Sequence, residues 1–195
     1  MACKFVLKLL NFLTKLSKRL IITDNTEPLR GGVTVFSVGD KVVYPTHGAG
    51  IIKNIKEEDI LGETKSYYVL SMLDGDLKVM VPVENCHELG LRKIIDRDEV
   101  GHILDVLKES ENELSSNWNR RYRNNMEKIK TGNIEEVAVV ARDLYSRDKE
   151  KGLSTGEKKM LEQAIRIVVS ELALATETEE EVMREKILEC LDTSN

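Results

Sequence analysis

The N-terminal half of the chain carries short β-branched runs separated by turn residues, which is typical of a small antiparallel sheet. Asp74-Gly75 is a strong hairpin signal between two such runs. Pro82 ends the last run, and because proline cannot donate to a ladder it indicates a strand end or an edge strand. The pattern predicts a small barrel of five strands, at residues 33–36, 41–44, 50–55, 66–72 and 77–81.

From residue 96 onward the spacing of apolar residues becomes helical, and five helices are expected. The first has an apolar stripe within residues 100–107, and the second begins near residues 115–117. One side of this second helix is expected to carry Trp118, Tyr122, Met126 and Ile129. Short connections between the helices favour a compact bundle.

Capping signals mark the starts of the last three helices. Asn133 with Glu136, Ser154 with Glu157 and Thr178 with Glu181 have the spacing of a capping box. Residues 160–175 are apolar almost all round the helix, which predicts that this helix is the buried centre of the bundle. The fold class is therefore α+β, with an antiparallel β barrel followed by an all-α helical bundle.

Residues 1–22 hold five Lys/Arg and no acidic residue, and their apolar residues recur at helical spacing. Lysines interrupt every apolar run, which argues against a membrane span or a secretory signal. A membrane-surface helix, a partner-binding helix and translated sequence upstream of the working start remain open. We expect residues 1–32 to be an extension, disordered or an isolated amphipathic helix, ahead of domains at 33–94 and 95–195.

Composition supports a packed core, since 41% of the residues are hydrophobic, and the net charge of -5 restricts nucleic-acid binding to a local patch. Residues 115–166 hold twelve Lys/Arg against eight Asp/Glu, whereas residues 171–192 hold two against eight. Cys3, Cys86 and Cys190 are odd in number and widely spaced, so they indicate neither a disulfide framework nor a metal site. A reducing cytoplasm fits this usage best.

Trp118, the only tryptophan, begins a run in which Arg120, Arg121 and Arg123 crowd one large ring. Arginines bind phosphates through charge and a planar donor fork, and an apolar ring can insert between base steps. A single tryptophan at helical spacing is more often a core residue. Both interpretations of Trp118 remain open on this run alone.

Candidates for catalysis are few. The loop at residues 48–50 is too short for a dinucleotide-binding fingerprint and is more simply a tight bend. The enzyme alternative is a hydrolase that uses His47, beside this bend, or the carboxylates, and it would need a concave pocket around His47. No nucleophile-base pair is evident, so we expect no enzyme activity, no cofactor and no small-molecule substrate.

Several motifs in one order resemble the CarD family of bacterial transcription regulators. They are Phe-Ser-Val-Gly-Asp-Lys-Val-Val-Tyr-Pro at residues 36–45, His-Gly-Ala-Gly at 47–50 and Gly-Asp-Leu-Lys-Val-Met-Val-Pro-Val-Glu-Asn at 75–85. Asn-Trp through Tyr at 117–122, Arg-Asp-Leu-Tyr at 142–145 and Gly-Leu-Ser-Thr-Gly-Glu-Lys-Lys-Met-Leu at 152–161 complete them. The resemblance covers about residues 34–192.

The resemblance implies a Tudor-like barrel that binds the β subunit of RNA polymerase and a helical domain that touches promoter DNA largely without sequence choice. It assigns polymerase binding to the strand with Leu77, Lys78, Val79, Met80, Val81 and Pro82. It makes Trp118 a minor-groove wedge at the upstream edge of the transcription bubble, and it places basic DNA contacts at or beside Arg120, Arg121, Arg123, Lys158 and Lys159. The expected protein is a cytoplasmic monomer that stabilises the open promoter complex.

Two positions depart from that pattern. Glu58 and Met80 stand where some relatives place an arginine against polymerase, and a carboxylate cannot replace a guanidinium at a charged contact. Met80 still suits an apolar contact between strands. The alternative function is a polymerase-binding adaptor whose helical domain contacts protein and not DNA.

Overall fold

The structure is a computed structural model, and it describes residues 36–60, 62–73, 75, 77–109 and 117–193. The predictions for residues 1–32, and for most of the strand expected at 33–36, lie outside this part of the chain. Phe36 is described, and it is a buried residue outside any strand. Its backbone N–H donates to the Tyr68 hydroxyl at 3.1 Å, so it joins the core of the sheet.

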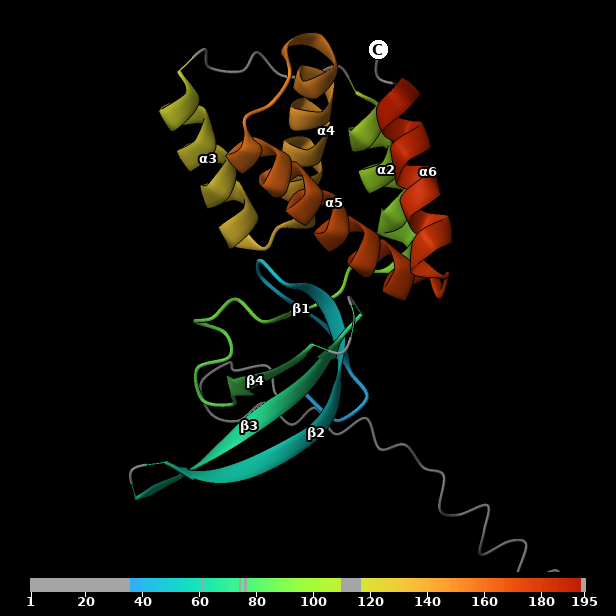
Figure 1. The fold of residues 1–195 in the computed structure, drawn as a ribbon. Coiled ribbons are helices and arrows are strands. Elements are labelled where there is room, and N and C mark those ends of the chain that lie inside the picture. The colour runs from blue at the N-terminus through green and yellow to red at the C-terminus, as the bar shows by residue number, and fades with distance from the viewer. Residues whose placement is uncertain (1–35, 61, 74, 76, 110–116, 194–195) are drawn as a thin grey trace, which may run out of the picture. The chain divides into compact units, whose positions relative to one another are not determined.

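Five antiparallel strands form one curved sheet (Figure 1). They are β1 (Lys41–Tyr44), β2 (Gly48–Ile60), β3 (Glu63–Met72), β4 (Lys78–Pro82) and β5 (Arg92–Lys93). The order across the sheet is β4-β3-β2-β1-β5, so β4 and β5 are its edges. Four strands correspond to predicted ones, whereas β5 was not predicted, because two residues paired only to β1 leave no alternation to detect.

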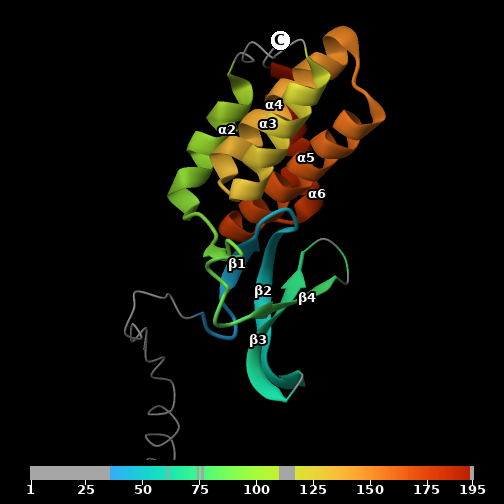
Figure 2. The ribbon, with the colours of Figure 1, turned by 90° about the vertical axis from the view of Figure 1, so that its left-hand side faces the viewer.

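The sheet encloses a core of its own. Its buried members are Phe36, Val42, Ile52, Tyr68, Leu70, Met72, Val81, Cys86 and Leu91. Strands β2 and β3 pair as far as Ile60 and Glu63, whereas β4 covers β3 only between Ser71 and Tyr67. Beyond β4 the hairpin therefore continues as two strands, and both views show it extending away from the helices (Figures 1 and 2).

The five predicted α-helices are present in the described part of the chain. A 3₁₀ turn (Arg97–Glu99) leads into α2 (Val100–Lys108), α3 (Trp118–Thr131), α4 (Ile134–Lys151), α5 (Thr155–Thr176) and α6 (Glu180–Thr193). Together with the sheet they confirm the α+β class. Helix α5 is the buried centre as predicted, since it carries thirteen buried residues and packs on α3, α4 and α6.

The caps agree with the predictions only in part. Ser154 and Glu157 form the predicted capping box at the start of α5. Asn133 caps α4 by accepting the N–H of Glu135, but Glu136 does not complete a box and instead accepts the Thr131 hydroxyl at 2.7 Å. The Thr178 N–H donates to the Ala173 carbonyl and so helps to close α5, while the predicted capping box of Thr178 and Glu181 on α6 stays a prediction.

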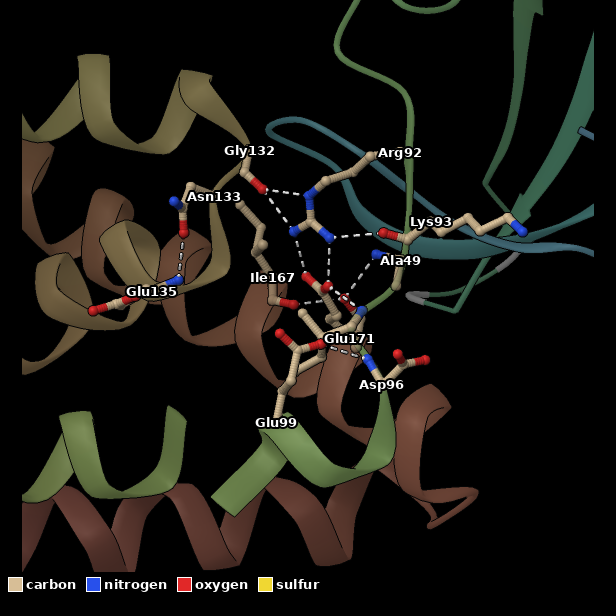
Figure 3. A network of polar contacts seen from close by, with 12 residues as sticks. Ala49, Arg92, Lys93, Asp96, Glu99, Gly132, Asn133, Glu135, Ile167 and Glu171 are labelled. Atoms are coloured by element: carbon tan, nitrogen blue, oxygen red, sulfur yellow. Dashed lines mark hydrogen bonds and ion pairs between the residues drawn. The ribbon is translucent and has the colours of Figure 1, made fainter. Parts of the chain in front are cut away.

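A partly buried ion pair joins the sheet to the helices (Figure 3). Arg92 on β5 donates from Nη1 and Nη2 to the two carboxylate oxygens of Glu171 at 2.6 and 2.8 Å. The same guanidinium donates to the Gly132 carbonyl after α3, and the N–H of Ile95 donates to Glu171. Glu171 is fully buried in the middle of α5, so one carboxylate connects β5, the following loop and the bundle.

Residues 48–50, predicted as a tight bend, are the start of β2 directly after the turn at 45–47, and they make a second connection to α5. Ala49 donates its N–H to the Ser170 hydroxyl at 2.9 Å. A Cβ built on Gly48 would lie 2.5 Å from that hydroxyl oxygen, and Gly48 has a φ of +89°. The glycine is therefore required by a close approach between the sheet and the helix.

Candidate nucleic-acid interface

Trp118 is the first residue of α3, and its ring is held in place while remaining partly exposed. Asn117 caps the helix by accepting the N–H of Arg120 at 3.1 Å. The indole Nε1–H donates to the Ser154 hydroxyl at 2.9 Å, and the ring lies 5.4 Å from the Tyr122 ring at an angle of 32°. The residue is 42% exposed. The ring is thus neither a core residue nor a loose surface side chain.

Ser154 connects this ring to the start of α5. Its hydroxyl accepts the Trp118 N–H and the backbone N–H of Glu157, and donates to the Glu157 carboxylate at 2.8 Å. A hydroxyl has one donor and two acceptor positions, so these three bonds use its full capacity. The indole N–H is therefore fixed to a helix cap that is itself fixed.

Arg121 differs from the neighbouring arginines, because it points into the protein. It is 4% exposed, and its Nε and Nη2 donate to one carboxylate oxygen of Glu157 at 2.8 and 2.6 Å. Its predicted role as a direct DNA contact does not fit this position, because the guanidinium forms a buried ion pair. Trp118 and Arg121 on α3 thus meet Ser154 and Glu157 on α5, with the same spacing of three residues on both helices.

The Glu157 carboxylate is ionised in this cluster. Burial opposes its ionisation, but hydrogen bonds from Ser154 and Arg121, with the Arg121 charge, outweigh burial and hold the pKa of Glu157 below its usual value. The sequence pattern predicted that Ser154 and Glu157 cap a helix, but it did not predict their contacts with Trp118 and Arg121. A capping box is a local pattern that does not indicate tertiary contacts, so the sequence held no signal for them.

Four of the predicted DNA-contacting cations are exposed. Arg120 and Arg123 lie on α3, and Lys158 and Lys159 lie in the first turns of α5. The contacts of α3 with Ser154 and Glu157 fix the starts of α3 and α5 against each other. Trp118 is attached through them to the cap of α5. Basic side chains from two helices therefore accompany one anchored aromatic ring.

The predicted polymerase-binding residues occupy the edge strand β4, and they are not equivalent. Lys78 and Met80 are exposed, Met80 by 45%, while Val81 is buried in the core of the sheet. Val79 packs partly against that core and Pro82 is half-buried. Leu77 precedes the strand, where its side chain is exposed and its carbonyl accepts the Met72 N–H. Val81 therefore supports the strand from inside and does not present its side chain to a partner.

Glu58, the position that departs from the family pattern, lies on the extended part of β2. Its carboxylate forms an ion pair with Lys56, two residues earlier on the same strand. This pairing reduces the negative charge that Glu58 presents. The two positions that depart from the family pattern therefore carry an exposed apolar side chain, Met80, and a carboxylate paired with Lys56, Glu58.

His47 lines a pocket of about 500 Å³ between the β1–β2 turn and α5. The concave site that the hydrolase alternative required is therefore present. The Thr46 carbonyl faces α5 and accepts the Gln163 amide at 3.0 Å, and the His47 ring stacks on Tyr44 at 5.3 Å. The pocket also holds Lys159 and Arg166, which suits an anion better than acid-base catalysis.

Other site classes have little support in the described residues. Cys86 and Cys190 are buried and form no disulfide within the described residues, and burial raises the pKa of both thiols. No group of three or more His, Cys, Asp or Glu side chains in the described part is placed to hold a metal ion. None of the helices described is long and apolar enough to cross a membrane.

Comparison with known proteins connects both halves to one family. Residues 36–95 match the family described as "CarD-like/TRCF RID domain", which implies interaction with RNA polymerase in general, and residues 102–188 match "CarD, C-terminal domain". The chain is also similar to "Putative transcription factor YdeB" of Bacillus subtilis (strain 168). The two are 41% identical over 138 residues, which are 71% of this chain and 90% of that relative. The chain therefore belongs to the CarD-like family of transcription factors.

Proposed function

We propose that this protein binds the β subunit of RNA polymerase through β4 and stabilises the open promoter complex through minor-groove contact by Trp118 at the upstream edge of the bubble. The observation that carries the proposal is the anchored, 42% exposed indole beside exposed cations from two helices. The protein acts without a cofactor and without catalysis. Residues 33–94 serve as the polymerase-binding domain and residues 95–195 as the DNA-contacting domain.

The position in which the Trp118 ring is held favours a role as a wedge. Inserting an apolar ring between bases costs a few kcal/mol of unstacking, and this cost is smallest where the duplex is already opened. A ring fixed by Ser154 and Tyr122 has little side-chain freedom left to lose on insertion. Arg120, Arg123, Lys158 and Lys159 add phosphate contacts that hold the backbone without reading sequence.

The edge position of β4 favours polymerase binding by this strand. An edge strand has unpaired backbone N–H and C=O groups, and a partner strand can add to it while outward side chains select the partner. Met80 is the outward apolar residue in the middle of this strand. We therefore assign it the central side-chain contact and assign Val81 a supporting role.

The DNA part is tested by promoter-opening kinetics with purified RNA polymerase and a promoter fragment that carries a fluorescent base in the bubble. We expect Trp118→Ala to lose the stabilisation of the open complex, since stacking of one base on an aromatic ring contributes about 1–3 kcal/mol. Val182→Ala removes an exposed apolar side chain from α6 and is the matched control. Normal open-complex lifetimes with Trp118→Ala would refute the wedge.

The polymerase part is tested by calorimetric binding to the isolated β subunit. Met80→Asp should abolish detectable binding, while Val38→Asp, at another exposed apolar residue outside β4, should not. Intact binding of Met80→Asp would place the interface on another surface.

The adaptor alternative keeps the polymerase contact and gives the helical domain a protein partner. A specific observation supports keeping it, because tryptophan and arginine are also the residues most enriched at protein–protein hot spots. Charge reversal of Arg120 and Arg123 separates the two functions. Loss of open-complex stabilisation with unchanged binding to β supports DNA contact, and unchanged stabilisation supports the adaptor.

A further inference from the structure

The pocket beside His47 has the side chains of an anion-binding site. It is lined from the β1–β2 turn and from one side of α5 by Thr46, His47, Lys159, Glu162, Gln163 and Arg166. Lys159 also belongs to the basic group near Trp118, so the pocket continues the proposed DNA-contacting surface along α5. None of the functions proposed so far uses Arg166 or the β1–β2 turn.

The turn that forms one wall of the pocket is held in an unusual conformation. Thr46 has a φ of +69°, a left-handed conformation that a β-branched residue rarely adopts. The Gln163 amide donates to its carbonyl at 3.0 Å, and Ala49 is fixed to Ser170 three residues later. Strain of this kind persists only where surrounding contacts impose it, and it concentrates at functional sites.

The spacing of the two cations suits the phosphates of a DNA strand. Lys159 and Arg166 are seven residues apart on α5, so they lie on one side of the helix about 10 Å apart along its axis. Each phosphate of a strand carries one negative charge and the phosphates recur along its backbone, so two cations on one side of a helix can bind different phosphates of the same strand. A backbone strand running beside α5 can meet both cations.

The charge of Glu162 opposes phosphate binding in this pocket. Phosphate binding there can therefore be tested by a gain of DNA affinity as well as by a loss. The exposed carboxylate of Glu162 lies between the two cations in the sequence and lines the same pocket. A phosphate in the pocket is repelled by this charge, so removing the charge should strengthen DNA binding. A pocket that serves only to pack the turn on α5 predicts no such gain.

We propose that Lys159, Arg166 and the β1–β2 turn form a second phosphate-binding site for the DNA backbone. The proposal rests on the proposed function, because it extends the DNA contact that begins at Trp118. With this second site, the DNA backbone also passes the junction of the sheet and the helices, and Arg166 contacts a phosphate directly.

The test measures binding of the full chain to a fluorescein-labelled duplex with a mismatched bubble, by anisotropy over a range of salt concentrations. Arg166→Gln should weaken binding about threefold to tenfold at low salt and reduce the slope of log K against log salt by about 0.9, the value for one lost phosphate contact. Glu162→Gln should strengthen binding. Lys186→Gln on α6 removes an exposed cation elsewhere and should change neither quantity.

Three outcomes separate this inference from the function on which it rests. If Arg123→Gln weakens binding but Arg166→Gln and Glu162→Gln do not change it, the second site is refuted and the first stands. If none of these variants, including Trp118→Ala, changes binding, both are refuted. Arg166→Lys keeps the charge, so a loss of the salt slope in this variant as well would show that Arg166 acts through packing and would overturn the proposal.

Discussion

Replacing Glu157 by glutamine tests the cluster that holds Trp118. The carboxylate accepts two bonds from Arg121 at one oxygen, and it accepts the Ser154 N–H and hydroxyl at the other. Glutamine retains one carbonyl oxygen, which cannot serve both sides, and its amide can only donate. The glutamine carbonyl can therefore accept from Ser154 or from Arg121 but not from both, and in either case the buried Arg121 guanidinium loses the charge of Glu157.

The expected loss in the free energy of unfolding is large. Removing one partner of a buried ion pair costs about 3–5 kcal/mol, because the remaining charge stays desolvated. Both groups here are almost fully buried, Arg121 at 4% and Glu157 at 2% exposure, so solvent screening gives little relief. A domain of ordinary stability, about 5–15 kcal/mol, should remain folded but with a clearly lower midpoint.

The loss should also depend on pH, with a definite sign. The pKa of Glu157 is lowered in the folded protein, so its contribution to stability is present above the unfolded pKa, about 4.3, and decreases as the pH falls through the folded pKa. The difference between the native protein and Glu157→Gln should therefore be full at pH 7 and shrink toward pH 3. Acid removes from the native protein the charge that the variant already lacks.

Urea unfolding followed by far-UV circular dichroism at several pH values measures both effects. Glu162→Gln, an exposed carboxylate on the same helix, is the matched control and should change stability by less than about 0.5 kcal/mol. A Glu157→Gln variant as stable as this control at pH 7 would refute the stabilising role of the buried ion pair. The same deficit at pH 7 and pH 3 would refute the role of the Glu157 charge.

Three further substitutions test the other contacts. Ser154→Ala should cost about 1 kcal/mol through loss of the α5 cap, and it should alter the fluorescence of Trp118, the only tryptophan, because the indole N–H loses its acceptor. Gly48→Ala should destabilise by about 2 kcal/mol or more, because the new Cβ meets the Ser170 hydroxyl at 2.5 Å and the φ of +89° is strained for alanine; Ser170→Gly should relieve the first cost only. Arg92→Met should cost about 3 kcal/mol in thermal unfolding, because Glu171 stays buried without its counter-charge; an unchanged melting temperature would contradict this.

The helices were predictable because local signals specify them. The Ser154–Glu157 box and the Asn117 cap are bonds within three residues, and the apolar run of α5 reflects burial on all sides. Strands β1 to β4 are also marked by a local signal, since each contains a short β-branched run that lies between turn residues. Strand β5 escaped prediction because its two residues are a strand only through pairing with β1.

The orientation of α3 shows why the site was only partly predictable. The apolar residues indicated a buried side through Trp118 and Tyr122, whereas the fully buried positions are Arg121, Asn125 and Ile129. Two of these three are polar, so a pattern based on hydrophobicity places the buried side of the helix about one residue away. An Arg-Arg pair gives no local sign of which guanidinium turns inward, and the partner that decides it, Glu157, lies 36 residues away.

Helix α5 has a consequence for the geometry of any complex that this protein joins. It holds the tryptophan cap at Ser154 and the sheet anchor at Glu171, seventeen residues apart, which is about 26 Å along the helix axis. On the proposed function these ends correspond to the DNA and polymerase sides. The helix then sets the distance and the rotation between the two sides. One residue inserted between the anchors would lengthen it by about 1.5 Å and rotate one end by about 100° relative to the other. Relatives with the same partners should therefore keep this segment at constant length while their surface loops vary.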